Sequence, residues 1–240
     1  MPKALNPLVE KMARLDSHGK LIKLVAVSEE TRYQAIRHFR CNSERILEVD
    51  NGIDLDEYFP SSSGGSTVFI NVGTQNENKN QAMLLSAFQI VARNHPDSRL
   101  ILVGNGPEHD ALLAASKGDS RIVLPGSVTN VAEWLSRANV YVQCSYREAM
   151  PMAVIEAMAS GLPVITTNVG GVGDVVRDGR EGLLIEPGSK GALVGAMERF
   201  FDAGFRSRMA SSSLLRASCF SSSEMAKGYE RIYLKAVRHS

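Results

Sequence analysis

Two glutamates separated by seven residues stand out in the stretch "YREAMPMAVIEAMASGLP". Residues 151–160 predict a short helix in which Glu156 is the only charged residue, and Pro151 suits its first position. Apolar residues on nearly every side predict a helix that is buried all round. A buried carboxylate needs a partner, and no residue three or four positions from Glu156 can form an ion pair with it. Glu148 is the other glutamate of the pair.

A lysine lies in the loop that follows the first strong strand pattern, "TVFINVG". Gly73 ends that strand, and Lys79 stands near the start of the next helix. A lysine beside the free amides of a helix N-terminus can bind a diphosphate, although a surface lysine also explains the pattern.

Glycine-rich turns follow other predicted strands. The turn "GNGPEHD" does not complete the dinucleotide-binding fingerprint G-x-G-x-x-G, because it has Pro107 and has His109 in place of the last glycine. No G-x-x-x-x-G-K-[ST] motif occurs either. The sequence therefore argues against an NAD site and against a phosphate-binding loop. Gly104 and Gly106 are expected to allow a tight turn and a close approach to a ligand. Ser127 and Val128 follow the third strand, and Asn130 is expected to cap the next helix. The stretch "NVGGVGDVV" forms another turn into a short helix.

Hydrolytic chemistry has little support in the sequence. The five histidines lie near no G-x-S-x-G elbow and form no metal spacing. Glu148 and Glu156 could form an acid–base pair for glycoside hydrolysis, but they belong to one loop and helix and not to facing elements. The three cysteines are far apart and odd in number, so we expect a reducing compartment.

These residues sit in a pattern of alternating strands and helices. Residues 20–27 and 45–49 read as strands around a helix capped by Ser28, and "FPSSSGGS" (59–66) as a linker. Six further strands with crossover helices predict an α/β, doubly wound parallel sheet, whose ligands bind beyond the carboxyl ends of the strands. The two serine triplets of the tail read as helix caps; Ser221 with Glu224 forms a capping box before a final helix.

Composition narrows the function further. Of 240 residues, 44% are hydrophobic and 22% charged, and the net charge is +1, so nothing favours nucleic acid. No apolar run is long enough to span a bilayer, and the start is too polar for a signal peptide. We expect a cytoplasmic protein and leave a peripheral membrane contact open.

Taken in order, the motifs resemble family 4 glycosyltransferases, which have the two-domain GT-B architecture. "EAMPMAVIEAMASGLPVITTNVGG" resembles that family's E-x7-E motif, and "NVG…K", "LVGNGP" and "VSEETR…NGIDLDEYFP" match its other segments, over roughly residues 24–238. The resemblance implies a Rossmann-like donor domain at 66–205, a helical tail at 206–240, and a remnant of the acceptor domain at 1–58. The rest of that acceptor domain would be missing.

The resemblance also implies roles for individual residues. Glu156 would bind the ribose of a nucleotide-diphosphate sugar, so that its partner is the ligand, and Glu148 would contact the donor sugar. Lys79 would neutralise the leaving diphosphate. The remaining donor-binding residues would be Gly73, Thr74, Gly104, Gly106, Ser127, Val128, Ala149, Met150, Pro151 and Met152, with Pro151 lacking an N–H to donate.

The resemblance implies retention of the anomeric configuration and no requirement for a bound metal. Thr74 stands where the family usually has an arginine, so Gln75 or Lys79 would have to compensate. We therefore expect a hexosyltransferase, acting on an unknown acceptor in polysaccharide or glycoconjugate synthesis, with an acceptor domain from a partner chain or a longer enzyme. A non-catalytic nucleotide-sugar-binding module and a sugar-nucleotide epimerase are the alternatives.

Overall fold

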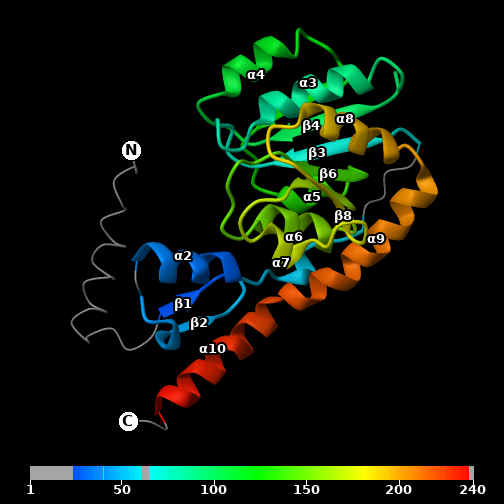
Figure 1. The fold of residues 1–240 in the computed structure, drawn as a ribbon. Coiled ribbons are helices and arrows are strands. Elements are labelled where there is room, and N and C mark those ends of the chain that lie inside the picture. The colour runs from blue at the N-terminus through cyan, green and yellow to red at the C-terminus, as the bar shows by residue number, and fades with distance from the viewer. Residues whose placement is uncertain (1–23, 40, 61–64, 238–240) are drawn as a thin grey trace.

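The computed structural model describes residues 24–39, 41–60 and 65–237, which form a small parallel sheet beside a larger one (Figure 1). In the small sheet, β1 (Leu24–Ala26) pairs with β2 (Ile46–Glu48), and α2 (Glu29–Phe39) connects them. Ser28 caps α2 as expected, since its hydroxyl accepts from the Thr31 amide. Both strands fall within their predicted segments, although residues 20–23 of the first lie outside the described part.

The larger sheet has six parallel strands in the order β5-β4-β3-β6-β7-β8, which confirms the predicted doubly wound sheet. The chain lays down three strands in one direction and then returns to add three on the other side of β3. The order therefore reverses between β3 and β6, which are neighbours. The strands are β3 (Val68–Val72), β4 (Arg99–Val103), β5 (Ile122–Gly126), β6 (Val140–Gln143), β7 (Val164–Thr167) and β8 (Gly182–Ile185).

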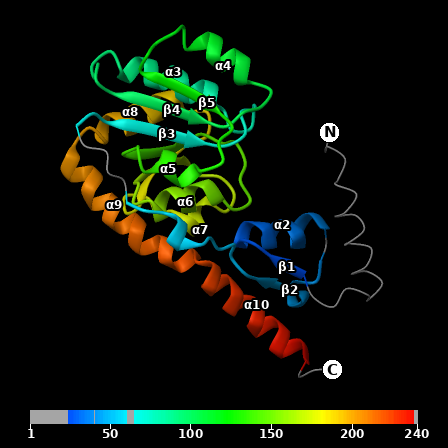
Figure 2. The ribbon, with the colours of Figure 1, turned by 180° about the vertical axis from the view of Figure 1, so that it is seen from behind.

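Helices cover both faces of this sheet, α3, α4 and α8 on one and α5, α6 and α7 on the other (Figures 1 and 2). Each face has its own core: Phe69 packs with Phe88 on the α3 side, and Tyr141 with Ile155 on the α6 side. Strands buried on both faces explain the nearly continuous apolar runs of the sequence. The helices are α3 (Gln81–Val91), α4 (His109–Ala115), α5 (Val131–Leu135), α6 (Met152–Ala159), α7 (Val172–Val175) and α8 (Lys190–Arg199).

Two long helices form the tail, α9 (Ala203–Ala217) and α10 (Ser222–Val237). The capping box is confirmed at α10, where the Glu224 amide donates to the Ser221 hydroxyl. The other serine triplet was wrongly assigned, because it lies inside α9 and caps nothing. Its hydroxyls bond to carbonyls instead, and that of Ser213 reaches the carbonyl of Glu181.

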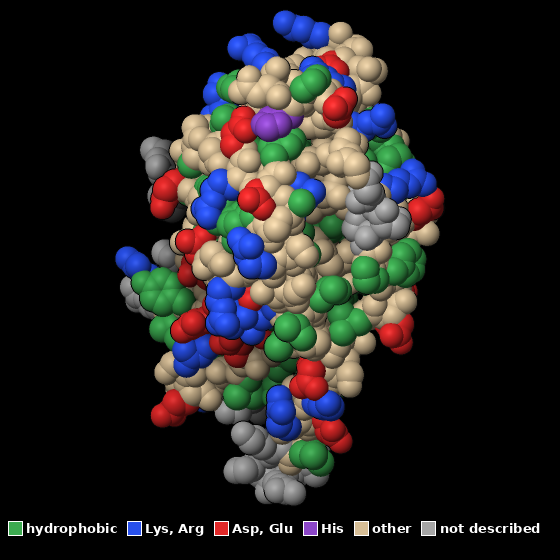
Figure 3. Space-filling model, turned by 90° about the vertical axis from the view of Figure 1, so that its right-hand side faces the viewer, with side chains coloured by type: hydrophobic (Ala, Val, Ile, Leu, Met, Phe, Trp, Pro, Cys, Tyr) green, Lys and Arg blue, Asp and Glu red, His purple; other side chains and the backbone are tan. Residues whose placement is uncertain are grey.

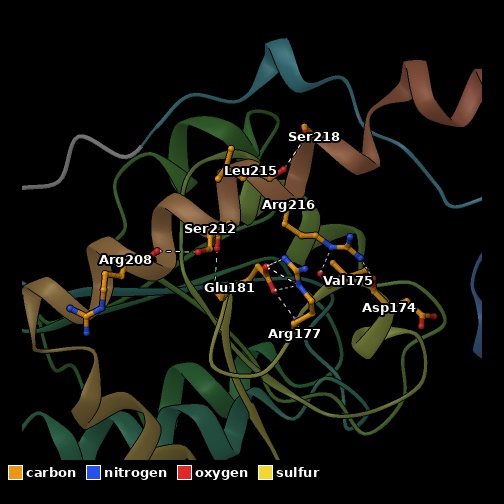
Figure 4. A network of polar contacts seen from close by, with 10 residues as sticks. Asp174, Val175, Arg177, Glu181, Arg208, Ser212, Leu215, Arg216 and Ser218 are labelled. Carbon is orange, nitrogen blue, oxygen red and sulfur yellow. Dashed lines mark hydrogen bonds and ion pairs between the residues drawn. The ribbon is translucent and has the colours of Figure 1, made fainter.

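Alpha-9 is bound to the larger sheet by a network of polar contacts (Figure 4). Arg216 donates to the carbonyls of Asp174 and Val175 at the end of α7. Next to it, Arg177 forms an ion pair with Glu181, whose side chain is fully buried just before β8. Burial would raise the pKa of Glu181, but hydrogen bonds from the Arg177 side chain and amide outweigh it and hold that pKa below its ordinary value.

The two sheets are joined by two chain connections that cross at one place. Ile53, in the connection from β2 to β3, donates to the carbonyl of Phe220 and accepts from the amide of Ser222. Gly52 lies so close to this crossing that a Cβ there would be 2.3 Å from the carbonyl oxygen of Ser221. The connections are thus held together ahead of α10, which runs beneath the small sheet (Figure 1).

The face over α9 carries apolar side chains interspersed with charges of both signs (Figure 3). No continuous basic surface occurs on that face, in agreement with the net charge of +1. Within the described residues, no helix is both long and apolar enough to cross a membrane.

Candidate donor-binding site

The predicted chemistry converges where the strand order reverses. Lys79 follows β3 and Glu148 follows the neighbouring strand β6, and the Lys79 Nζ lies 2.7 Å from the Glu148 Oε1. In open parallel sheets, ligands bind in the crevice at this reversal. Both side chains are largely shielded, with 26% of Lys79 and 9% of Glu148 exposed. The structure thus brings the two predicted catalytic residues into one ion pair.

Backbone contacts hold the two loops that carry this pair. The Tyr146 amide donates to the carbonyl of Asn78 at 2.8 Å, and the Asn78 side chain donates back to the carbonyl of Arg147 at 3.0 Å. These residues directly precede Glu148 and Lys79. The position of the ion pair therefore depends on the loops and not only on its own side chains.

The Glu148 loop is also braced from the side of the small sheet. The Ser28 hydroxyl donates to the carbonyl of Ala149 at 2.9 Å. Gly170 and Gly171 approach the same loop so closely that a Cβ on Gly170 would lie 1.7 Å from the carbonyl oxygen of Glu148. Glycine is therefore required in the turn after β7 by backbone packing.

Glu156 lies on the partly exposed side of α6, the helix that begins just after Glu148. Met152, Ala153 and Glu156 are partly exposed, whereas the remaining residues of α6 are buried, so the helix is not buried all round as predicted. The Tyr58 hydroxyl is close enough to influence the pKa of this carboxyl group. Burial raises the pKa of Glu156, and the Tyr58 hydroxyl opposes the rise.

The start of α6 differs in detail from the prediction. Pro151 precedes the first helical residue, Met152, and occupies the cap position. The Met152 amide donates to the carbonyl of Met150 at 3.0 Å, so it is occupied within the chain. Met150 is buried, and its sulfur accepts from the Asn51 amide.

The glycines of the second loop approach other protein atoms. A Cβ on Gly104 would lie 2.0 Å from the carbonyl oxygen of Gly73, and one on Gly106 would lie 2.4 Å from that of Gln75. Gln75 itself is fully buried, and its Oε1 lies 2.7 Å from the His109 Nδ1. Gln75 is thus engaged inside the protein and is not placed to replace an arginine at the diphosphate.

Other predicted residues frame the crevice more loosely. Thr74 and Ser127 are exposed in the loops after β3 and β5, and Val128 packs against the α6-side core. Asn130 caps α5 as predicted, by accepting from the Glu133 amide. Beside the ion pair lies a cavity of about 850 Å³, lined by Asn76, Glu77, Asn78, Pro107, Glu108, Tyr146 and Arg147.

Metal binding and thiol chemistry find no support in the described residues. No group of three or more His, Cys, Asp or Glu side chains there could hold a metal ion. Cys144 and Cys219 are free thiols, and burial raises the pKa of Cys144 to about 12. A buried thiol with so high a pKa is not a nucleophile at neutral pH.

Sequence patterns could not locate Tyr58 or Ser28 at this site. Both pairs of residues are about a hundred or more positions apart in the chain, Tyr58 with Glu156 and Ser28 with Ala149. The segment "NGIDLDEYFP", quoted above as part of a family pattern, was the available signal for Tyr58.

The fold is that of the C-terminal part of GT-B glycosyltransferases, and comparison with known proteins agrees. The model of the family described as "Glycosyl transferases group 1" matches residues 66–203, and the chain belongs to this family.

Named relatives are glycosyltransferases. A D-inositol 3-phosphate glycosyltransferase of Streptomyces avermitilis is 26% identical over 90% of this chain and 52% of its own length. A UDP-Gal:alpha-D-GlcNAc-diphosphoundecaprenol alpha-1,3-galactosyltransferase of Escherichia coli is 27% identical over 81% and 55%. The chain thus spans about half the length of these curated relatives.

Solved structures show the same fold. A glycosyltransferase from Rickettsia africae superposes with a TM-score of 0.84 at 18% identity, covering 98% of this chain and 69% of that one. HepE of Anabaena, solved with UDP and glucose, gives a TM-score of 0.78 at 20% identity over 90% and 63%.

Proposed function

We propose that this chain supplies the donor-binding half of a retaining, family 4-like glycosyltransferase that moves a hexose from a nucleotide-diphosphate sugar to an acceptor. The observation that carries the proposal is the Lys79–Glu148 ion pair at the reversal of the strand order, with Glu156 on the helix that begins just after Glu148. A lysine, a carboxylate and a second, ribose-facing carboxylate are the groups that a diphosphate, a sugar and a nucleoside each require.

Each residue has one task in this scheme. The Lys79 ammonium neutralises the charge that grows on the departing diphosphate, which is electrostatic stabilisation of the transition state. Glu148 exchanges its ion pair with Lys79 for hydroxyls of the donor sugar. Glu156 accepts hydrogen bonds from the ribose. No metal ion is expected to be required, so a chelator should leave turnover unchanged.

The donor is proposed to be a uridine nucleotide sugar, because UDP is named in relatives and structural neighbours. The relative from Escherichia coli has UDP-Gal in its name, and GtfA, a pneumococcal O-GlcNAc transferase, was solved with UDP and GlcNAc.

The acceptor side of the reaction is proposed to come from residues beyond the donor domain, in a partner chain or in a longer protein. Residues 1–58 would form part of that side, 66–205 the donor domain and 206–240 the tail. The chain covers about half of its curated relatives, which supports this division. The proposed location is the cytoplasm, at or away from a membrane surface.

Calorimetry with UDP tests the ribose assignment. Wild-type protein should bind UDP, and Glu156→Ala should weaken that binding by about tenfold or more, since a charged hydrogen bond is worth roughly 1.5–3 kcal/mol. Equal affinity in the two proteins would exclude Glu156 from the nucleotide site.

A transfer assay tests turnover. With UDP-sugar and a candidate acceptor present, release of UDP by this chain alone would show that no further domain is needed, and NMR of the product would establish its anomeric configuration. Binding of UDP without release, even after an acceptor domain is added, would favour the non-catalytic module.

A further inference from the structure

The cavity of about 850 Å³ beside the Lys79–Glu148 pair is formed by three loops, which follow β3, β4 and β6. Its volume falls in the range of about 300–1,000 Å³ that is typical of small-molecule sites. Neither Lys79 nor Glu148 belongs to its lining. Glu156 lies on α6, which covers the opposite face of the sheet from α3 and α4 (Figure 1). The cavity therefore adjoins the proposed nucleotide-binding residues without being lined by them.

Tyr146 gives this cavity an aromatic wall. Its amide is fixed to the Asn78 carbonyl at 2.8 Å. One edge of its ring lies beside Gly188, in the loop before α8, where a Cβ would be 3.6 Å from the ring carbon Cε1. Tyr146 is nevertheless 48% exposed. A ring that is held at its backbone and at one edge, and is open elsewhere, can pack against an apolar face of a ligand.

The polar side chains of the lining supply both donors and acceptors. Glu77 and Glu108 offer acceptors, and the Arg147 guanidinium offers donors. Within the described part of the chain, the Oε2 of Glu108 and the Oδ1 of Asn78 are shielded from solvent and have no hydrogen-bond partner. Such atoms are costly to leave unpaired. The cavity wall thus has hydrogen-bonding capacity that the protein itself does not satisfy.

The charges of the lining select the class of ligand. Two carboxylates, of Glu77 and Glu108, outnumber the one guanidinium, of Arg147, so the lining disfavours phosphate and other anions. A metal ion is also unsuited, because no group of three or more His, Cys, Asp or Glu side chains in the described residues could hold one. Pro107 and the Tyr146 ring offer too little surface for a wholly apolar ligand. A neutral molecule with many hydroxyls and one apolar face fits these properties, and a sugar ring is such a molecule.

We propose that this cavity is a saccharide-binding subsite, which holds a sugar ring of a glycan and not the sugar of the nucleotide donor. The Tyr146 ring packs against the C–H face of the sugar. Glu108 and Arg147 bind its hydroxyls, since a planar carboxylate or guanidinium can form two hydrogen bonds with neighbouring groups. The inference goes beyond the proposed function, because it requires no bound nucleotide.

An NMR titration of the full chain, labelled with ¹⁵N, tests binding. The probes are three neutral disaccharides, lactose, cellobiose and N,N′-diacetylchitobiose. At least one of them should shift the amide signals of Tyr146, Asn78 and Arg147 in a saturable manner. No such shift with any of the three would overturn the proposal.

Variants of Tyr146 test the role of its ring. Tyr146→Ala should weaken binding of the disaccharide about tenfold, and Tyr146→Phe, which keeps the ring, should bind nearly as well as wild type. Tyr33→Ala on α2 is the matched control, because Tyr33 is 47% exposed and lies outside the lining. Wild-type affinity in Tyr146→Ala, or an equal loss in Tyr146→Phe, would contradict the proposal.

Glu108→Gln tests the polar side of the subsite, because it keeps the size of the side chain and removes its charge. Affinity for the disaccharide should fall about threefold or more, since hydrogen bonds to a charged group are the stronger ones. Asp110→Asn, an exposed position on α4, is the control and should bind like wild type. Equal losses in the two variants would mean that only the overall charge matters, and the assignment of Glu108 would be wrong.

Calorimetry with UDP and UDP-glucose separates this subsite from the donor site. The expected result is that Tyr146→Ala lowers affinity for the disaccharide far more than affinity for UDP-glucose. If Tyr146→Ala weakened UDP-glucose and no disaccharide bound, the cavity would serve the donor sugar, and this proposal would fail while the proposed function stood. If a disaccharide bound through Tyr146 and wild-type protein bound neither nucleotide, the proposed function would fail and this proposal would stand.

Discussion

Two glutamates, one near the amino ends and one near the carboxyl ends of the strands of the larger sheet, have contrasting surroundings. Glu181, at the amino edge before β8, is fully buried and meets the Arg177 guanidinium and amide, which hold its pKa low. Glu156, at the carboxyl edge, is partly exposed, lies near one phenol, and has a raised pKa. The difference teaches that a carboxylate which supports the fold has its charge compensated by protein. A carboxylate suited to binding a ligand has a negative charge that the protein compensates only in part.

Arg177→Ala should have the largest effect on stability, because it leaves the buried Glu181 carboxylate without its cation. Removing the cation leaves a charge buried in the protein without compensation, so the free energy of unfolding should fall clearly. Denaturant titration at pH 7 measures it, with the neighbouring exposed Arg180→Ala as control. A loss equal to that of the control would mean that water replaces Arg177 at Glu181.

The same pair predicts a pH dependence of defined sign. The lowered pKa of Glu181 means that its contribution to stability is present above the pKa of an unfolded glutamate and is lost as the pH falls through the folded pKa. The difference between wild type and Arg177→Ala should therefore shrink in acid. A difference that stays constant down to pH 3 would contradict the assignment.

Glu156→Gln should produce the opposite result, weaker nucleotide binding with little change in stability. The raised pKa of Glu156 means that the ionised form disfavours folding at neutral pH, and that stability rises as the pH falls through the folded pKa toward the unfolded one. We expect a change within about 1 kcal/mol in the free energy of unfolding. A large loss of stability would assign Glu156 a structural role.

Lys79→Ala should also leave stability nearly unchanged, although it breaks an ion pair. Lys79 is about a quarter exposed and its partner Glu148 lies at the crevice, so the pair is worth less than about 1 kcal/mol to folding. UDP affinity should fall about tenfold, or roughly 1.4 kcal/mol. Retained affinity in Lys79→Ala would remove this lysine from the diphosphate.

Asp174→Asn should give the smallest effect, a slight gain in stability. Burial and the charges of Glu29 and Glu30 raise the pKa of Asp174 more than a hydrogen bond from the Glu29 backbone and the charge of Arg216 lower it, so on balance its ionised form disfavours folding above that pKa. Allowing for screening, removing the charge should add about 0.5 kcal/mol at pH 7. The gain should vanish in acid, where wild-type Asp174 is protonated. A loss of stability would show that the carboxylate has a favourable partner.

The sequence predicted the elements whose signals are local and missed contacts that depend on the assembled chain. Ser28 and Asn130 were predicted as caps because a cap acts within three residues. The serine triplet of α9 was wrongly predicted to cap a helix, because serine favours caps over helix interiors. The packing of α9 on the sheet instead places the triplet inside the helix.

For the candidate site, the sequence predicted where the residues lie but not which residues they contact. Lys79, Glu148 and Glu156 were placed at one edge because parallel strands align their carboxyl ends. Their partners could not be predicted, since nothing in the spacing of Lys79 and Glu148 requires them to meet, and Tyr58 comes near Glu156 only through the path of the connecting segment.

The crossing of the two chain connections at Ile53 and Ser222 has a mechanical consequence. Because both connections pass through one hydrogen-bonded bridge, a rotation of the small sheet relative to the large one would have its pivot there. The hydrogen bond from Ser28 to Ala149 limits that rotation from the crevice side. A side chain at position 52 would collide with the Ser221 carbonyl, so Gly52→Ala should displace the pivot itself and with it the alignment of the two halves.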